Sequence, residues 1–172
     1  MEQKPFLGQK IAILVANGFS ESDLIETQKK IQALGGTPRV VSMDQGLVNS
    51  WNGSGWGLNF AADQALNSAL AADFDGLVVP GGVKSAEKLK LTAHTRRFLN
   101  GFLATGKAVF VLNDAIELLS FTETLDGRKI ADEGVVVDGN LMTCVGDVDA
   151  AVLTQFEAFA LGLLSDEQAV AA

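Results

Sequence analysis

The stretch GKAVFVLNDAIELLS, residues 106–120, carries the pattern that decides the fold. Its first half is a short run of apolar and β-branched residues, which is typical of a strand covered on both faces of a parallel sheet. Its second half spaces apolar residues as one face of a helix does. The stretch therefore predicts a buried strand, a sharp turn at Asn113 and Asp114, and an amphipathic helix.

Strands and helices alternate along the rest of the chain. Three further strand-like runs are KIAILVA (10–16), TPRVVSM (37–43) and FDGLVVPGG (74–82). Helical spacing recurs around 93–104, and VVVDGNLMTCV at 135–145 places Asp-Gly between two apolar runs, which predicts a hairpin. This order favours an α/β fold with a doubly wound, mostly parallel sheet and a small antiparallel hairpin.

Composition limits the classes of function. The chain has 172 residues and neither a repeat nor a linker-like segment, so we expect a single domain over residues 1–172. A net charge of -8 argues against nucleic acid as a partner, because a phosphate backbone needs a basic face. One cysteine and one histidine cannot supply a Cys/His zinc cluster. We expect a cytoplasmic protein with no signal peptide, membrane segment, metal or cofactor.

Four segments stand in an order that resembles one known group of proteins. They are ILVANGFSESDL, DFDGLVVPGG, GKAVFVLNDAIELL and VVVDGNLMT. The residues and the order of these segments resemble the motifs of the ThiJ/PfpI superfamily. This superfamily includes the Parkinson-linked deglycase family and has the class I glutamine amidotransferase-like architecture. The resemblance implies a flavodoxin-like three-layer sandwich, a homodimer or larger homo-oligomer, and a pocket at the carboxyl ends of the strands.

The resemblance also locates the family's reactive site. Active members carry a cysteine at the strand-to-helix corner, the elbow, where a helix N-terminus stabilises the thiolate. Here Asn113 stands in that place and Asp114 replaces the histidine that commonly follows. A carboxamide is no nucleophile at neutral pH, because its nitrogen lone pair is delocalised. The elbow therefore cannot perform the family's covalent chemistry.

Three further positions correspond to the family's site. Asp23 stands where the family has a glutamate beside the cysteine, and it could hydrogen-bond Asn113. Gly81 and Gly82 match the turn whose N–H groups help to stabilise an oxyanion. Such a turn implies a small carbonyl or carboxylate ligand, although Asp23 and Asp114 would oppose an anion.

Simpler structural roles compete with each functional interpretation at the elbow. Asp114 could act as a chemical carboxylate, but a side chain that opens a helix is more simply an N-cap, bonding N–H groups near Glu117. Asn113 tolerates a left-handed backbone and could hold the turn.

Residues away from the elbow also have simple structural interpretations. Cys144 in an apolar neighbourhood is expected to be an inert, small hydrophobic residue. His94 is expected to be a packed or edge residue, and Glu21 is expected to be solvated. Trp51 and Trp56 lie in a Gly- and Asn-rich stretch that predicts hairpin-like excursions, and they form either a ligand platform or a packing contact.

Two functions follow from these residues. The first is a non-catalytic domain that acts in oligomeric assembly or small-ligand binding. Its degenerate site also resembles the C-terminal domains of large-subunit catalases, and this resemblance implies a stress-related role. The second is a cysteine-independent hydrolase or a glyoxalase- or deglycase-like enzyme, in the manner of an intracellular protease or amidase. This enzyme would use Asp23 and a bound water.

Overall fold

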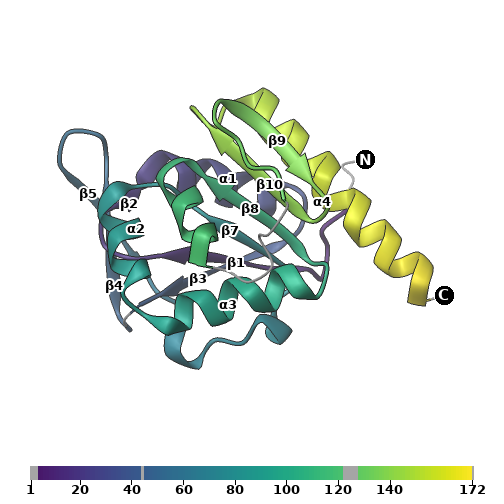
Figure 1. The fold of residues 1–172 in the computed structure, drawn as a ribbon, viewed down its shortest axis with the longest axis horizontal. Helices are drawn as coiled ribbons and strands as arrows, with labels where there is room; N and C mark the ends of the chain where they lie inside the picture. The colour runs from purple at the N-terminus through teal and green to yellow at the C-terminus, as the bar shows by residue number, and fades with distance from the viewer. Residues whose placement is uncertain (1–3, 44, 122–127, 172) are drawn as a thin grey trace.

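A seven-stranded sheet forms the centre of the molecule in a computed structural model that describes residues 4–43, 45–121 and 128–171 (Figure 1). The strands lie in the order β6-β3-β1-β7-β8-β10-β9, and every neighbouring pair is parallel except β10 and β9. Their bounds are β6 Gln64–Ala65, β3 Thr37–Ser42, β1 Lys10–Val15, β7 Gly76–Val79, β8 Ala108–Leu112, β10 Leu141–Val145 and β9 Gly134–Asp138. The predicted α/β class, the mostly parallel sheet and the antiparallel hairpin are confirmed.

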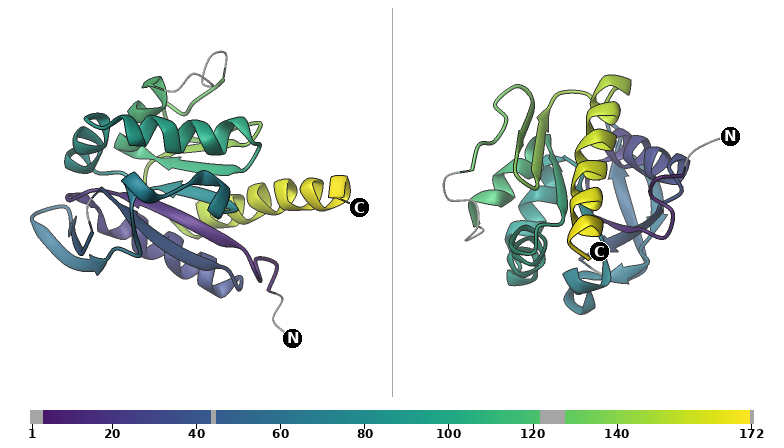
Figure 2. Two further views of the ribbon diagram at one scale, coloured as in Figure 1. Left: turned by 90° about the horizontal axis from the view of Figure 1, so that it is seen from below. Right: turned by 90° about the vertical axis from the view of Figure 1, so that its right-hand side faces the viewer.

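Helices cover both faces of this sheet and make three layers (Figure 2). On one face lie α1 (Glu21–Ala33) and α4 (Ala150–Ala171), and on the other lie α2 (Val83–Lys90), α3 (Ala93–Ala104) and the 3₁₀ helix η3 (Asn113–Phe121). Alternate residues of β1 point to opposite cores, so Ile11 and Ile13 pack with α1 and α4 while Ala12 and Leu14 pack with α2 and α3. Both faces of the central strands are therefore apolar, as the sequence predicts.

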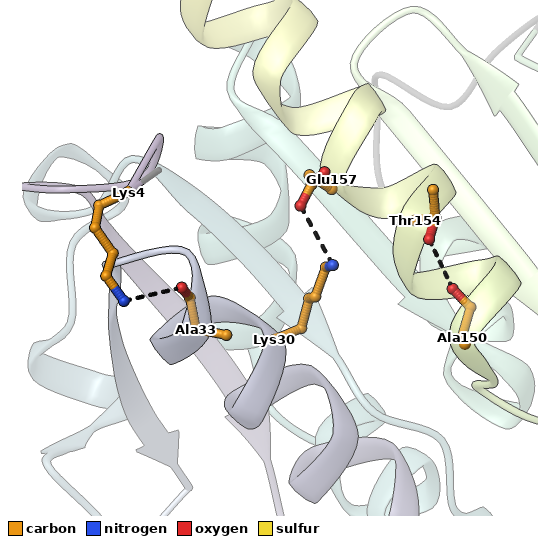
Figure 3. A network of polar contacts seen from close by, with 6 residues as sticks. All are labelled: Lys4, Lys30, Ala33, Ala150, Thr154 and Glu157. Carbon is orange, nitrogen blue, oxygen red and sulfur yellow. Dashed lines mark hydrogen bonds and ion pairs between the residues drawn. The ribbon is translucent and has the colours of Figure 1, made fainter. Parts of the chain in front are cut away.

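Polar contacts join the two helices of one face to each other and to the N-terminal segment. The Lys30 ammonium on α1 lies 3.2 Å from a carboxylate oxygen of Glu157 on α4 (Figure 3). In the same view, Lys4 donates to the carbonyl oxygen of Ala33 at the end of α1.

A second, three-stranded sheet lies beside the elbow. It consists of β2 (Phe19–Ser20), β4 (Leu47–Trp51) and β5 (Trp56–Ala61), of which β4 and β5 form an antiparallel hairpin. This confirms the predicted hairpin-like excursion. Two short 3₁₀ helices, η1 (Leu66–Ser68) and η2 (Ala71–Asp73), then lead into β7.

Two local predictions need correction. The sequence pattern predicts no helix between Gly82 and the helical segment around 93–104, whereas α2 begins directly after Gly82. The stretch after the elbow is a 3₁₀ helix and not the expected amphipathic helix of α type. Its buried Ala115 and Leu118 satisfy either helix, because residues three apart lie on the same face in both, whereas the four-residue spacing of Ala115 and Leu119 is typical of the α-helix. Within the described ranges, no helix combines the length and apolar character that a bilayer-spanning segment requires.

Candidate functional site

The carboxyl ends of the central strands bring the predicted site residues together. Asp23 comes from the start of α1 after β1, Gly81 and Gly82 follow β7, and Asn113 and Asp114 follow β8. Since these parallel strands are neighbours, the segments that leave them meet at one edge of the sheet.

The glycine turn after β7 exists because two backbones approach each other closely. Gly82 has a φ of +115°, and a Cβ added to it would lie 2.5 Å from the carbonyl oxygen of Gly18. A Cβ on Gly81 would lie 2.9 Å from the Cβ of Asn113. The Ser20 N–H donates to the Gly81 carbonyl at 2.8 Å, which closes the contact. Only glycine fits at this crossing.

Asn113 is built into the backbone network at the elbow. Its φ is +50°, the left-handed conformation predicted from its residue type. Its amide nitrogen donates to the Gly146 carbonyl at 3.0 Å, and its amide oxygen accepts from the Gly146 N–H at 2.8 Å. A carboxamide has an N–H donor for the carbonyl of a peptide group and an oxygen acceptor for its N–H, whereas a thiol is only a weak donor and a weak acceptor. The side chain thus fastens the end of β10 to the end of β8.

Asp23 is a buried carboxylate, and its side chain is 4% exposed. It accepts a 2.9 Å hydrogen bond from the Gly81 N–H and also bonds with the side chains of Asn113 and Ser20. Burial raises the pKa of Asp23 above its ordinary 3.8, and the nearby Asp114 raises it further, while these hydrogen bonds lower it. Desolvation has the largest effect, so the pKa of Asp23 is raised overall.

Asp114 contacts the glycine turn instead of capping its own helix. It lies inside the first turn of η3, and its carboxylate accepts from the Gly82 N–H at 3.2 Å. The predicted cap near Glu117 is therefore not the contact that the structure gives to Asp114. With Asp23 on Gly81, both N–H groups of the predicted oxyanion turn have carboxylates of the chain itself as acceptors.

A pocket of about 890 Å³ opens above these residues. Asp23, Gly82, Asn113 and Asp114 line it, whereas Gly81 is absent from its lining. The charged lining residues are Glu21, Asp23, Glu26, Glu87 and Asp114, with Lys84 as the one base. Their electrostatic field opposes an anion. Sequence reasoning missed Glu26, Lys84 and Glu87, because their convergence depends on how α1 and α2 pack.

Glu21 was expected to be solvated, and that is wrong. Its carboxylate accepts from the Leu58 N–H at 3.0 Å and from the Ser50 hydroxyl at 3.3 Å. It therefore binds the start of α1 to the hairpin of the small sheet, where the Leu58 N–H belongs to an edge strand.

The tryptophans form the packing contact considered for them, and one of them also lines the pocket. Trp51 and Trp56 form an edge-to-face pair across the hairpin, with ring centroids 5.5 Å apart. Trp51 also lines the pocket, where the Lys84 ammonium lies 5.4 Å from its ring centroid.

The remaining candidates lie outside the pocket. Cys144 on β10 is buried, and desolvation, with smaller contributions from Asp23 and Asp149, raises the pKa of its thiol. His94 is exposed at the start of α3. In the described part of the chain, no cluster of three or more His, Cys, Asp or Glu side chains is placed to hold a metal ion.

Comparison with known proteins agrees with this architecture. The sequence profile described as the DJ-1/PfpI family matches residues 9–161. General stress protein 18 of Bacillus subtilis is 28% identical over 123 residues, which cover 72% of this chain and 70% of that protein. Protein/nucleic acid deglycase 2 of Escherichia coli is 24% identical over 133 residues, covering 77% and 76%.

Two longer proteins contain a similar region. Catalase HPII of Pseudomonas putida is 26% identical over 131 residues, which make up 76% of this chain and 18% of the catalase. A crystal structure from Anabaena variabilis, a two-domain protein with DJ-1/ThiJ/PfpI-like and ferritin-like domains, superposes with a TM-score of 0.78 at 24% identity. It covers 91% of this chain, which spans about half (48%) of that protein. The chain belongs to the DJ-1/PfpI family.

Proposed function

We propose that this DJ-1/PfpI family member is a non-catalytic domain that acts in oligomeric assembly or small-ligand binding, in a stress-related setting. The observation that carries the proposal is the hydrogen bonding of the Asn113 side chain. Both polar ends of its amide are bonded to the Gly146 peptide group, so the elbow residue serves the fold. A nucleophile must instead present a reactive lone pair to a substrate.

Other side chains near the elbow do not replace the missing thiol. Cys144 is buried, and its raised pKa keeps it protonated at neutral pH. Asp114 is engaged by the Gly82 N–H. The turn that would stabilise an oxyanion would have to release Asp23 and Asp114 before it could bind one.

The pocket favours an uncharged ligand over a carboxylate. Of the two ligand classes that the sequence suggests, a small carbonyl compound avoids repulsion from the five acidic side chains of the lining. Trp51 supplies an aromatic surface for such a molecule. We therefore rank a neutral carbonyl ligand above a carboxylate.

Assembly and stress form the second part of the proposal. The name of General stress protein 18 supports the stress-related setting, and the match to 18% of catalase HPII supports a role as one part of a larger assembly. We propose a homodimer or larger homo-oligomer. Sedimentation equilibrium over a range of concentrations tests this, and a monomer at every concentration would contradict it.

The proposal of a non-catalytic function is tested by assays of methylglyoxal consumption and of chromogenic ester and amide hydrolysis. We expect no turnover above buffer for the parent protein, for Asp23→Ala or for Cys144→Ser. Turnover well above background that disappears in Asp23→Ala would overturn the proposal.

One observation supports the alternative, a cysteine-independent hydrolase or a glyoxalase- or deglycase-like enzyme. Asp23 is a buried carboxyl with a raised pKa at the wall of a pocket, which is the character of a general acid or base. It would activate a bound water. The same assay separates the two functions, because only the enzyme loses a measurable rate in Asp23→Ala.

A further inference from the structure

A second pocket of about 250 Å³ is lined by the C-terminal end of α2, whereas residues nearer the start of that helix line the first. It is formed where the end of α2 and the start of α3 meet η3. Leu89, Ala93 and Leu118 give it an apolar part, and Lys90, Thr95 and Arg96 give it a polar one. None of these residues lines the elbow pocket.

Thr95 in this pocket has an unused hydroxyl. The residue is 4% exposed, and its oxygen has no hydrogen-bond partner among the described residues. A threonine hydroxyl in a helix ordinarily bonds a carbonyl three or four residues earlier. A buried polar group without a partner is costly, and such groups mark places where a ligand or ion completes the bonding.

The surrounding charge is positive in a strongly acidic protein. Residues 88–97, KLKLTAHTRR, contain four of the thirteen Lys and Arg residues and the single His, with no acid, whereas the whole chain has a net charge of -8. The first turn of α3 holds no acidic residue, although a helix N-terminus favours negative charge. No acid within this stretch complements its helix end and its bases, and Glu117 of η3 pairs with Lys90 alone among them.

The bases differ in how far they are already engaged. Lys90 lies 2.9 Å from Glu117, and Arg97 donates to the carbonyls of Ala69 and Leu66. Arg96 is exposed, and within the described ranges it has neither an ion pair nor a hydrogen-bonded side-chain partner. Its guanidinium is thus available for a bidentate bond to an oxyanion.

We propose that this second pocket binds a small organic oxyanion, a carboxylate or phosphate ester with a short apolar body. Arg96 and the Thr95 hydroxyl bind the charged group at the N-terminus of α3, and Leu89, Ala93 and Leu118 contact the apolar body. The Thr92 hydroxyl already accepts the His94 N–H, so it caps the helix beside the ligand. The site is independent of the elbow pocket and of any ligand bound there.

The test measures binding of sodium butyrate, acetate and inorganic phosphate to the full chain by calorimetry, at constant ionic strength set with chloride. Amide shifts of residues 93–96 report the place of binding. We expect saturable binding, tighter for butyrate than for acetate, which has the same charged group and a shorter apolar body. Arg96→Gln and Thr95→Val are each expected to weaken it at least about tenfold. Lys29→Gln, which removes one charge from the exposed side of α1, is the matched control and should leave it within about twofold.

Thr95 variants separate binding from folding. Thr95→Val removes an unsatisfied hydroxyl, so its midpoint of thermal unfolding without anion should equal or exceed that of the parent. Thr95→Ser keeps the hydroxyl and should keep binding, which covers the case in which Thr95→Val does not fold. The proposal is overturned if no anion binds saturably, if Arg96→Gln binds as the parent does, or if acetate binds more tightly than butyrate.

Discussion

Replacing Asn113 by the family's cysteine should destabilise the protein without producing an enzyme. Asn113→Cys loses the hydrogen bond to the Asp23 carboxylate and two hydrogen bonds to the Gly146 peptide group, and each of these two is worth about 0.5–1.5 kcal/mol. It also places a residue less suited than Asn in the left-handed conformation, at a φ of +50°, which costs about 1 kcal/mol. Without the bond to Asp23, the sum is a loss of about 2–4 kcal/mol in the free energy of unfolding, measured by urea denaturation.

The new thiol should also be a poor nucleophile. The carboxylates of Asp23 and Asp114 lie beside the elbow and raise the pKa of a thiol there. The N–H groups of Gly81 and Gly82 remain bonded to those carboxylates, so a developing oxyanion finds no free donor. Methylglyoxal consumption should stay at background. Turnover that is abolished by iodoacetamide would refute this reasoning, as would stability equal to that of the parent.

Asn113→Gly is the matched control for the stability measurement. Glycine accepts the positive φ without strain and loses the same hydrogen bonds. Asn113→Gly should therefore be more stable than Asn113→Ala by about 1 kcal/mol, the cost of the left-handed backbone. Equal stability of these two variants would show that the conformation at position 113 contributes nothing.

Three further predictions concern the neighbours of the elbow. The pKa of Asp23 is raised above 3.8 in the folded state, so the folded protein binds this proton more tightly than the unfolded chain does. The parent should therefore lose stability relative to Asp23→Asn as the pH rises from 3.8 through the folded-state pKa. A pH-independent difference between the two in urea titrations would contradict this. Gly82→Ala should lower the free energy of unfolding by more than about 2 kcal/mol, because its Cβ would meet a backbone oxygen. Gly106→Ala, which has a positive φ but no atom within 4 Å of the added Cβ, should lower it by about 1 kcal/mol. Cys144 should react slowly with Ellman's reagent in the native protein and fully in urea; rapid native reaction would show that the thiol is accessible.

Most of the sheet could be predicted from the sequence, because buried parallel strands and an Asp-Gly hairpin have strong local patterns. The helix α2 could not. Its buried face consists of Ser85, Ala86 and Leu89, so only one large apolar residue marks it. The hydroxyl of Ser85 is buried because it accepts the Ala16 N–H from the end of β1, a contact that helical periodicity does not report.

The members of the site and the hydrogen bond between Asp23 and Asn113 could be predicted, whereas the bonds to distant backbone groups could not. The left-handed backbone of Asn113 follows from its residue type and its place at a sharp turn, and the structure confirms it. Its partner Gly146 lies 33 residues away and contributes only backbone groups, which leave no mark in a sequence. The bond from Gly82 to Asp114 arises in the same way, because the chain crossing that exposes the N–H is set by tertiary packing.

The polar groups at the elbow cannot serve both the fold and a transition state. A covalent site keeps its backbone donors free and its nucleophile unbonded, so that these interactions form only as charge develops on the substrate. Here the Gly81 N–H bonds Asp23, the Gly82 N–H bonds Asp114, and the Asn113 amide bonds Gly146. Releasing the Gly81 N–H would leave the buried Asp23 carboxylate with fewer donors, which raises the cost of its charge. The substitution at position 113 is therefore accompanied by a bonding pattern that stabilises the closed elbow over any state able to bind an oxyanion.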